Sequence, residues 1–262
     1  MIEFAVCGIG VWGPGFSSWD ELQSGLRGGT WVETATLQPD LIPARERRRA
    51  PRFVKMAVEV MGQACAVAQF DPSSLVNVFA TAMSDMDTTD YMCRILAESP
   101  RLVSPTRFHN SVTNAPSGYW SIATKSHSSA NAVCAYQYSA PMALLEAASQ
   151  LVAEQQPVLL CVQDESSPQA LRHVSAAVET LAIAMLIAQP GVCPHELMHC
   201  RLNLLAGEAG WPQLPQALQG QLAGNPSARL LPLALAAAAS EPVSMEMPVS
   251  PGMRLQLQIQ PK

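Results

Sequence analysis

The chain has 262 residues, of which 48% are hydrophobic and only 14% charged, and its net charge is −5. This length is enough for one large domain or two small ones around a sizeable core, and the acidic balance gives no sign of nucleic-acid binding. Because few charged residues are available to cover the surface, the composition predicts that part of it is buried against a partner.

Strand and helix signals alternate along the first 190 residues. The expected elements in chain order are a strand at 3–9, helices at 19–26 and 53–69, a strand at 75–82, helices at 88–98 and 117–124, a strand at 132–136, a helix at 139–154, and strands at 158–162 and 181–188. The alternation predicts α/β layers around a mixed or parallel sheet.

The sequence changes in character after about residue 189, where prolines become frequent. Apolar and polar residues alternate at 198–204 and again at 253–260, which predicts two strands with one face in water. A short helix is expected at 213–222. The longest apolar stretch, at 230–239, is too short to span a membrane and is interrupted by Pro232.

The cysteine content bears on the cellular compartment. The chain has seven cysteines, an odd number, and no C-x-x-C motif. Its opening residues, MIEFAVCGIG, form a strand-like run without the basic start of a secretion signal. We therefore expect a cytoplasmic protein with reduced thiols rather than a disulfide framework.

One segment matches a metal-binding motif. His195-Glu196-Leu197-Met198-His199 fits H-E-x-x-H, the signature of zinc hydrolases. That motif works on a helix, where two histidines four positions apart share one face and one metal ion. Here the alternation from Met198 onward predicts a strand, on which the two histidines would be roughly 13 Å apart. We interpret the match as a coincidence and predict no metal site.

Six of the 16 basic residues fall within eleven positions of the chain. They are Arg45, Arg47, Arg48, Arg49, Arg52 and Lys55. One interpretation is an ordinary solvated helix start, with Pro51 in its first turn. Cations at a helix N-terminus oppose the helix dipole, however, so the cluster equally fits a docking patch for an anionic partner.

Three segments resemble the β-ketoacyl synthases. The run CGIGVWGPG at 7–15 is similar to their first strand and turn, and the pattern F-x-N-x-x-x-N-A-P-x-G at 108–118 is similar to the loop and helix at their dimer interface. Residues 131–150 are similar to their nucleophile elbow and the helix that follows. The resemblance implies a thiolase-like αβαβα layered fold, with a synthase-like N-terminal domain at 1–190 and a shortened C-terminal part at 191–262.

Aligned without gaps, Gln137 occupies the position at which these enzymes carry the acylated cysteine. An amide cannot be acylated in that way, and Cys134 lies three residues earlier, inside the predicted strand. The two histidines of the family, in H-G-T-G-T and G-H-x-x-G-A contexts, have no counterpart after Gln137. The resemblance therefore implies that this chain has no catalytic residue of its own.

A glutamine at this elbow resembles the chain length factor, the inactive partner in a ketosynthase heterodimer. The short chain and the N-A-P-x-G-Y-W loop are most similar to the factor of aryl polyene clusters, which make fatty-acid-like polyketides. This implies an active ketosynthase partner, an acidic acyl carrier protein docked on the arginine cluster, and no cofactor. The implied tunnel and interface residues, with Phe108 and Trp120 at the tunnel floor, are Phe108, Asn110, Asn114, Tyr119, Trp120, Tyr136, Gln137 and Tyr138.

Three other functions stay open on the sequence. The first is a divergent synthase or acyl hydrolase that uses Cys134 as its nucleophile. The second is a zinc hydrolase built on His195, Glu196 and His199. The third is a homodimeric protein that binds acyl chains.

Overall fold

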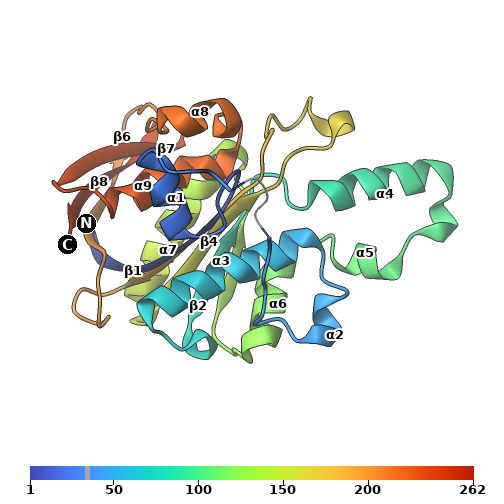
Figure 1. The fold of residues 1–262 in the computed structure, drawn as a ribbon, viewed down its shortest axis with the longest axis horizontal. Helices are drawn as coiled ribbons and strands as arrows, with labels where there is room; N and C mark the ends of the chain where they lie inside the picture. The colour runs from blue at the N-terminus through green and yellow to red at the C-terminus, as the bar shows by residue number, and fades with distance from the viewer. Residues whose placement is uncertain (33–35) are drawn as a thin grey trace.

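The computed structural model describes residues 1–32 and 36–262, and these form an eight-stranded sheet with helices on both faces (Figure 1). The strand order is β3-β2-β4-β5-β1-β6-β8-β7. β2 pairs in parallel with β3 and β4, and the other pairings are antiparallel. The predicted mixed α/β fold class is confirmed.

The strands are β1 (Ile2–Trp12), β2 (Val76–Ala80), β3 (Ala130–Val133), β4 (Val158–Asp164), β5 (Leu181–Ala188), β6 (Met198–Ala206), β7 (Val243–Ser250) and β8 (Met253–Pro261). The α-helices are α1 (Trp19–Leu26), α2 (Ala44–Arg47), α3 (Arg52–Ala68), α4 (Met86–Glu98), α5 (Pro105–His109), α6 (Ala115–Thr124), α7 (Ser139–Glu154), α8 (Gln216–Leu222) and α9 (Leu231–Ala236). Five short 3-10 helices are η1 (Pro72–Ser74), η2 (Pro100–Leu102), η3 (Tyr136–Tyr138), η4 (Gln169–Leu171) and η5 (Pro226–Leu230).

Most predicted elements are present, and the largest differences are in three places. The strand expected at 132–136 ends at Val133, because the chain turns into η3. Three short helices, α2, α5 and α9, and one strand, β7, were not expected. β7 alternates apolar and polar residues from Val243 to Ser250, but it contains Pro248, and proline disfavours the interior of a strand.

Two apolar cores lie on opposite faces of the sheet. One face packs against α1, α7, α8 and α9, and the other against α3 and α6. α3 can lie directly on β1 because a Cβ atom at Gly8 or Gly10 would come within 2.0 Å of a backbone oxygen of α3. These glycines in the predicted first strand therefore serve close helix-to-sheet packing.

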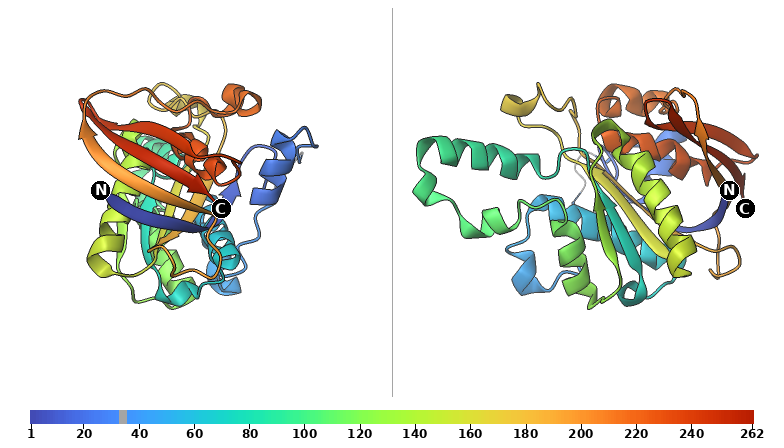
Figure 2. Two further views of the ribbon diagram at one scale, coloured as in Figure 1. Left: turned by 90° about the vertical axis from the view of Figure 1, so that its left-hand side faces the viewer. Right: turned by 180° about the vertical axis from the view of Figure 1, so that it is seen from behind.

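The C-terminal strands β6, β8 and β7 extend the sheet beyond β1. Their inner face is apolar, while a polar row formed by Glu3, Arg201, Gln258 and Ser244 crosses the outer face. Figure 2 shows this face of β1, β6 and β8 without a covering helix (left view). The predicted alternation of both strands is confirmed.

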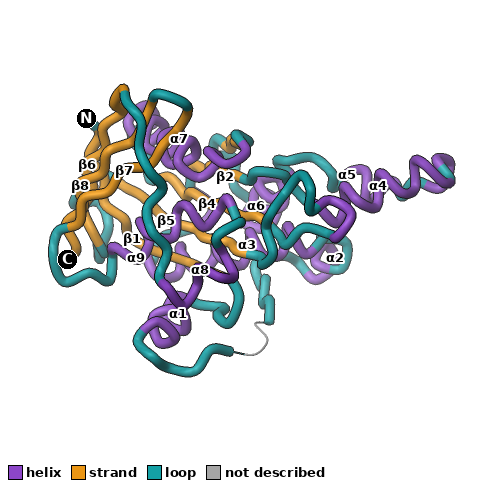
Figure 3. The backbone as a smooth tube through the Cα atoms, turned by 90° about the horizontal axis from the view of Figure 1, so that it is seen from above, coloured by secondary structure: helices purple, strands orange, loops and turns teal. Residues whose placement is uncertain are grey.

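α4, η2 and α5 form an arm, defined here as residues 86–109, which projects from the body (Figures 1 and 3). The arm starts where Asp85 caps α4 by accepting a hydrogen bond from the backbone N–H of Thr88. It carries the exposed apolar side chains of Leu96, Leu102 and Phe108.

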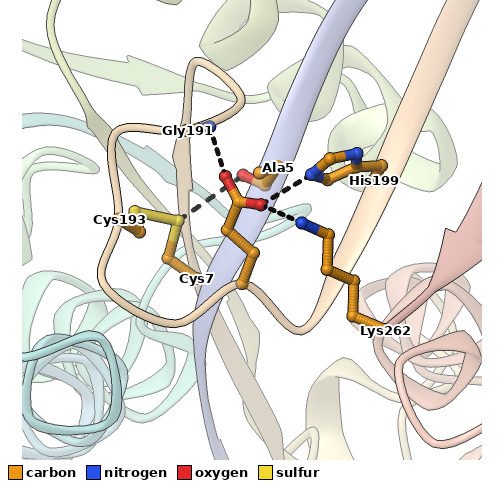
Figure 4. The surroundings of a disulfide bond; sticks show 7 residues. Ala5, Cys7, Gly191, Cys193, His199 and Lys262 are labelled. Atoms are coloured by element: carbon orange, nitrogen blue, oxygen red, sulfur yellow. Dashed lines mark hydrogen bonds and ion pairs between the residues drawn. A yellow bond between two sulfur atoms is a disulfide. The ribbon is translucent and has the colours of Figure 1, made fainter.

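The expectation that the cysteines are all reduced is wrong for one pair. Cys7 on β1 and Cys193 in the β5–β6 loop form a disulfide (Figure 4). β5 and β6 both pair with β1, so the loop between them crosses β1 and brings together two residues 186 positions apart. Cys65, Cys93, Cys134, Cys161 and Cys200 are free. In the described part of the chain, no helix is both long and apolar enough to cross a bilayer.

Candidate functional site at the strand-to-helix elbow

The segment between β3 and α7 makes a tight elbow. After Val133 the chain turns through η3, and Tyr136 takes a left-handed conformation with φ of 50°. The Ser139 hydroxyl, at the start of α7, accepts a hydrogen bond from the Ala135 N–H and lies 2.8 Å from the Tyr136 carbonyl oxygen. Gln137, in the middle of the turn, is exposed.

The elbow does not offer an activated nucleophile. Gln137 carries an amide, which neither ionises nor accepts an acyl group as a thiolate does. The Cys134 thiol donates to the Ala82 carbonyl oxygen, 3.2 Å away. Burial, followed by the nearby charge of Asp164, raises the pKa of Cys134 above its ordinary value. Cys134 is therefore protonated at neutral pH, which disfavours the alternative in which it acts as the nucleophile.

The two tyrosines of the elbow point to different neighbours. The Tyr136 hydroxyl donates to the Val174 carbonyl oxygen in the loop between β4 and β5. The centroids of the Tyr138 and Trp211 rings are 5.9 Å apart. The Arg229 guanidinium also lies over the Trp211 ring, 4.6 Å from its centroid. The elbow is thus tied to loops on both sides.

The remaining predicted tunnel and interface residues divide by burial. Phe108 is 62% exposed, Asn114 is exposed and Tyr119 is partly exposed. Asn110 is buried and accepts a hydrogen bond from the Tyr119 hydroxyl. Trp120 is 0% exposed and belongs to the core beneath α6. In this structure Trp120 faces the interior of its own chain, so it can act on a tunnel only through the residues that it supports.

Several elements in the β3 half of the molecule carry exposed apolar side chains, and Figure 1 shows the arm and α6 on the side away from β6 and β8. These side chains come from the arm, the arm-to-α6 loop, α6, the elbow and the β4–β5 loop, and α4 contacts η4 while α6 contacts β3. We call them the apolar surface: Leu96, Leu102, Phe108, Val112, Ile122, Tyr136, Val174 and Val178. The predicted tunnel and interface residues include Phe108 and Tyr136, and Val112 and Ile122 lie within the segment that resembles the dimer-interface loop and helix, whereas the others lie outside any motif.

The arginine cluster also divides. Arg47 bonds to Asp40 and to the Ile42 carbonyl oxygen, and Arg52 bonds to Glu165 and stacks over Trp12. Lys55 is partly buried on α3, while Arg45, Arg48 and Arg49 are exposed around the α2–α3 turn. Only part of the predicted cluster is therefore free to meet an anionic partner.

A polar cavity of about 250 Å³ lies between the start of α3 and the base of the arm. Glu165, which is 4% exposed, lines it together with Arg49, Arg107 and Asp85. Burial, followed by the charge of Asp85, raises the pKa of Glu165 to about 7, although Arg52 lies 3.2 Å away and opposes the shift.

The H-E-x-x-H segment has no helical geometry. His195 lies in a loop and His199 on β6, as the alternation predicted. Glu196 accepts hydrogen bonds from Lys262, from the Gly191 N–H and from His199, so it acts as a clamp on this loop (Figure 4). Within residues 1–32 and 36–262 no group of three potential ligand side chains is placed to hold a metal ion.

Comparisons with known proteins agree with the fold. The sequence profile described as "Beta-ketoacyl synthase, N-terminal domain" matches residues 17–229. No curated protein sequence matches the chain.

Several solved structures share the fold. A ketosynthase (ApeO) in complex with its chain length factor (ApeC) from Xenorhabdus doucetiae matches with a TM-score of 0.69 and 18% identity, over 98% of this chain and 100% of that chain. The ishigamide ketosynthase/chain length factor matches with a TM-score of 0.75 and 13% identity, over 100% of this chain and 99% of that one. A β-ketoacyl synthase from Burkholderia phymatum STM815 matches with a TM-score of 0.72 and 11% identity, over all of both chains. At these identities the likeness concerns the fold, and it confirms the predicted thiolase-like architecture.

Proposed function

Because this chain belongs to the β-ketoacyl synthase N-terminal domain family, we propose that it is a non-catalytic chain length factor that pairs with an active β-ketoacyl synthase. The observation that carries this proposal is the elbow itself. Its turn is fully formed, yet it presents the amide of Gln137 where the family resemblance expects a nucleophile. The thiol beside it, that of Cys134, donates to the Ala82 carbonyl oxygen, and its pKa is raised above the ordinary value.

The apolar surface supports a pairing role. Exposed aromatic and aliphatic side chains surround β3, whose outer edge has no strand partner among the described residues. An open edge bordered by apolar side chains is a surface that stable partners cover. In this proposal the synthase covers it, supplies the cysteine and histidines, and leaves Phe108, Tyr119, Tyr136 and Gln137 facing a shared acyl tunnel.

The finer assignments follow from the same proposal. Residues 1–190 form the synthase-like domain and 191–262 a shortened part of the same fold. The product is a polyene or another fatty-acid-like polyketide, which grows in the cytoplasm on an acidic acyl carrier protein. Arg45, Arg48 and Arg49 supply the exposed charges for that carrier.

The test is co-expression of the tagged chain with the ketosynthase genes of its own genome, followed by affinity purification and size-exclusion chromatography. We expect one ketosynthase to co-purify at a one-to-one ratio, and acyl transfer to label that partner but not this chain in intact-mass spectra. An acyl adduct on this chain would overturn the non-catalytic role. A stable homodimer that captures no ketosynthase would favour the acyl-binding alternative.

A further inference from the structure

A buried carboxylate lies directly behind the elbow. Asp164, at the end of β4, is 3% exposed. It accepts hydrogen bonds from the Thr81 hydroxyl at 2.8 Å, the Ala82 N–H at 2.8 Å and the Ser227 hydroxyl at 2.6 Å. No basic side chain pairs with it among the described residues. Burial raises the pKa of Asp164, and the hydrogen bonds from Ser227, Ala82 and Thr81 oppose that shift and satisfy its oxygens.

Thr81 connects Asp164 to the elbow through hydrogen bonds. Its N–H donates to the Val133 carbonyl oxygen, and its own carbonyl oxygen lies 3.0 Å from the Ser139 hydroxyl, which holds the turn. The Cys134 thiol donates to Ala82, the neighbour of Thr81. The elbow therefore rests on residues 81–82, and these rest on Asp164.

The residues with strained backbone connect to the same hydrogen-bond network, which we call the hub: Asp164 with Thr81, Ala82 and Ser227. Five described residues other than glycine have positive φ, and Gln69, Lys125 and Gln155 among them are ordinary left-handed helix caps. The other two are Tyr136 at the elbow and Ser84 at the root of the arm. Both connect to Thr81. The Ser84 N–H donates to the Thr81 hydroxyl. The Ser139 hydroxyl lies within hydrogen-bond distance of the carbonyl oxygens of both Tyr136 and Thr81.

Both strained residues adjoin surface that is exposed and apolar. Tyr136 is itself 54% exposed, and the arm that starts after Ser84 carries Leu96, Leu102 and Phe108. Unfavourable backbone conformations persist only where the surroundings enforce them, and they are concentrated at functional positions. Exposed tyrosines held in a fixed conformation are frequent anchors of protein interfaces, because little entropy is lost when they bind.

We propose that Asp164 is a positioning residue that holds the elbow and the arm root in their presenting conformations, and that Tyr136 is the main binding anchor for the partner synthase. The proposal rests on the pairing function proposed above and specifies how this chain prepares its side of the interface. The elbow, which carries no nucleophile, serves as a preorganised contact.

The test combines binding with hydrogen exchange. Affinity for the co-purified ketosynthase is measured by biolayer interferometry for Tyr136→Ala, Asp164→Asn and the double variant. We expect Tyr136→Ala to weaken binding about 30-fold and Asp164→Asn about 10-fold. The double variant should lose less affinity than the two single losses combined, because part of the Asp164 effect acts through Tyr136 and only the part that acts through the arm root is independent of it.

Gln163→Leu is the matched control. Gln163 precedes Asp164 on β4, is equally buried, and donates to Phe53 on the opposite face of the sheet. This variant should lose stability without losing affinity once the folded fraction is taken into account. If Asp164→Asn does not fold, Ser139→Ala removes the link to the elbow and leaves the carboxylate intact, and we expect it to weaken binding about 5-fold by the same route.

Hydrogen exchange of the peptide 130–139, measured on the isolated chain, tests the hub without a partner. We expect faster exchange there in Asp164→Asn and in Ser139→Ala, and unchanged exchange in Gln163→Leu. Unchanged exchange in all three variants, or affinity losses that add up in the double variant, would overturn the proposal. A wild-type chain that binds no ketosynthase would instead overturn the pairing function, while the exchange result still decides the role of Asp164.

Discussion

The two edge strands of the sheet end in opposite surroundings. β3 is a four-residue edge, exposed over most of its length and bordered by exposed apolar side chains such as Ile122 and Tyr136. β7, at the other edge, contains Pro248 and buries much of its second half. Proline and burial protect an edge against further strand pairing, so β7 is the protected edge and β3 is the open one.

Two carboxylates repeat this contrast. Near β6, hydrogen bonds from Lys262, followed by those from Gly191 and His199, lower the pKa of Glu196 to about 2. Near the arm, burial raises the pKa of Glu165 to about 7, because Arg52 alone does not offset the charges of Asp85 and Asp87. Glu196 has a cationic partner and two further donors, whereas Glu165 has one cationic partner against two neighbouring negative charges. Such an imbalance in an otherwise well-packed fold indicates where a partner is required.

The largest expected effect comes from placing a charge on the open side. Ile122→Glu puts a carboxylate on α6, which contacts the open edge strand β3, and partner binding there would bury it unpaired. We expect loss of at least about 4 kcal/mol of binding free energy, roughly a thousandfold in Kd. The measurement is co-purification and biolayer interferometry with the ketosynthase.

Leu204→Glu is the control for that substitution. Leu204 is exposed on β6, in the half of the sheet away from β3, and the same change there should leave Kd within about twofold. Equal losses from the two variants would show that the two regions do not differ as binding surfaces.

The next effect concerns Trp120, whose ring is fully buried between α6 and the sheet. Trp120→Ala should lower the free energy of unfolding by about 3–5 kcal/mol, because it leaves a large cavity in a close-packed core. Through the collapse of α6 it should also lengthen the acyl products by a few carbons. Urea denaturation and mass spectrometry of the products measure the two effects.

Phe108→Ala separates the two consequences of the Trp120 substitution. Phe108 is exposed, so its loss should cost little stability in the isolated chain and still lengthen the products if it faces the tunnel. Trp211→Ala should leave product length unchanged, because its ring packs between Tyr138 and Arg229 on the other side of the elbow. Wild-type product lengths from assembled Phe108→Ala and Trp120→Ala complexes would contradict this account of length control.

Trp120 also shows how far the sequence could go. Local periodicity was sufficient for α3, α7, β6 and β8, because each reflects a repeat of burial along the chain itself. The N-A-P-x-G-Y-W loop identified a special segment, but whether an aromatic ring in it points inward or outward depends on α3, which lies more than fifty residues earlier.

Long-range register was similarly hidden. The bond between Cys7 and Cys193 requires knowing that β5 and β6 both flank β1. The hub around Asp164 joins residues 81, 82 and 227, which no spacing rule connects. These contacts are set by tertiary packing, and the sequence contains no local repeat that reports them.

The pH dependence of stability should reveal the buried carboxyl group of Glu165. The folded-state pKa of Glu165, about 7, lies above its ordinary value of 4.5, so the folded protein keeps a proton that the unfolded chain releases. Its contribution is complete below pH 4.5 and is lost as the pH rises through 7. We expect the free energy of unfolding to fall between pH 5 and pH 8, by no more than about 3 kcal/mol from this group.

Glu165→Gln removes the titrating group and keeps an acceptor for Arg52, so its stability should vary less over this range. The measurement is urea unfolding at pH 5, 6, 7 and 8. Glu196 cannot produce the same trend, since its lowered pKa affects stability only as the pH falls from 4.5 toward 2. Parallel pH profiles for wild type and Glu165→Gln would mean that the pKa of Glu165 is not raised in solution.

The smallest effect is expected for the arginine cluster. Arg45, Arg48 and Arg49 are exposed, and exposed charges add little to stability but speed the encounter with an oppositely charged protein. Reversing Arg48 and Arg49 to Glu should reduce the association rate with an acidic acyl carrier protein by about tenfold at low salt, and by much less at physiological ionic strength.

Arg47→Glu would not isolate this effect, because Arg47 also holds Asp40 and the Ile42 carbonyl. The control is therefore Arg27→Glu combined with Lys125→Glu, which changes the net charge equally at two exposed positions outside the cluster. Stopped-flow measurements of the association rate at several salt concentrations distinguish a local effect from one of net charge. Equal losses of rate in the two double variants would reflect net charge alone. A loss of rate confined to the Arg48 and Arg49 variant would place the carrier on the same side of the molecule as the open edge.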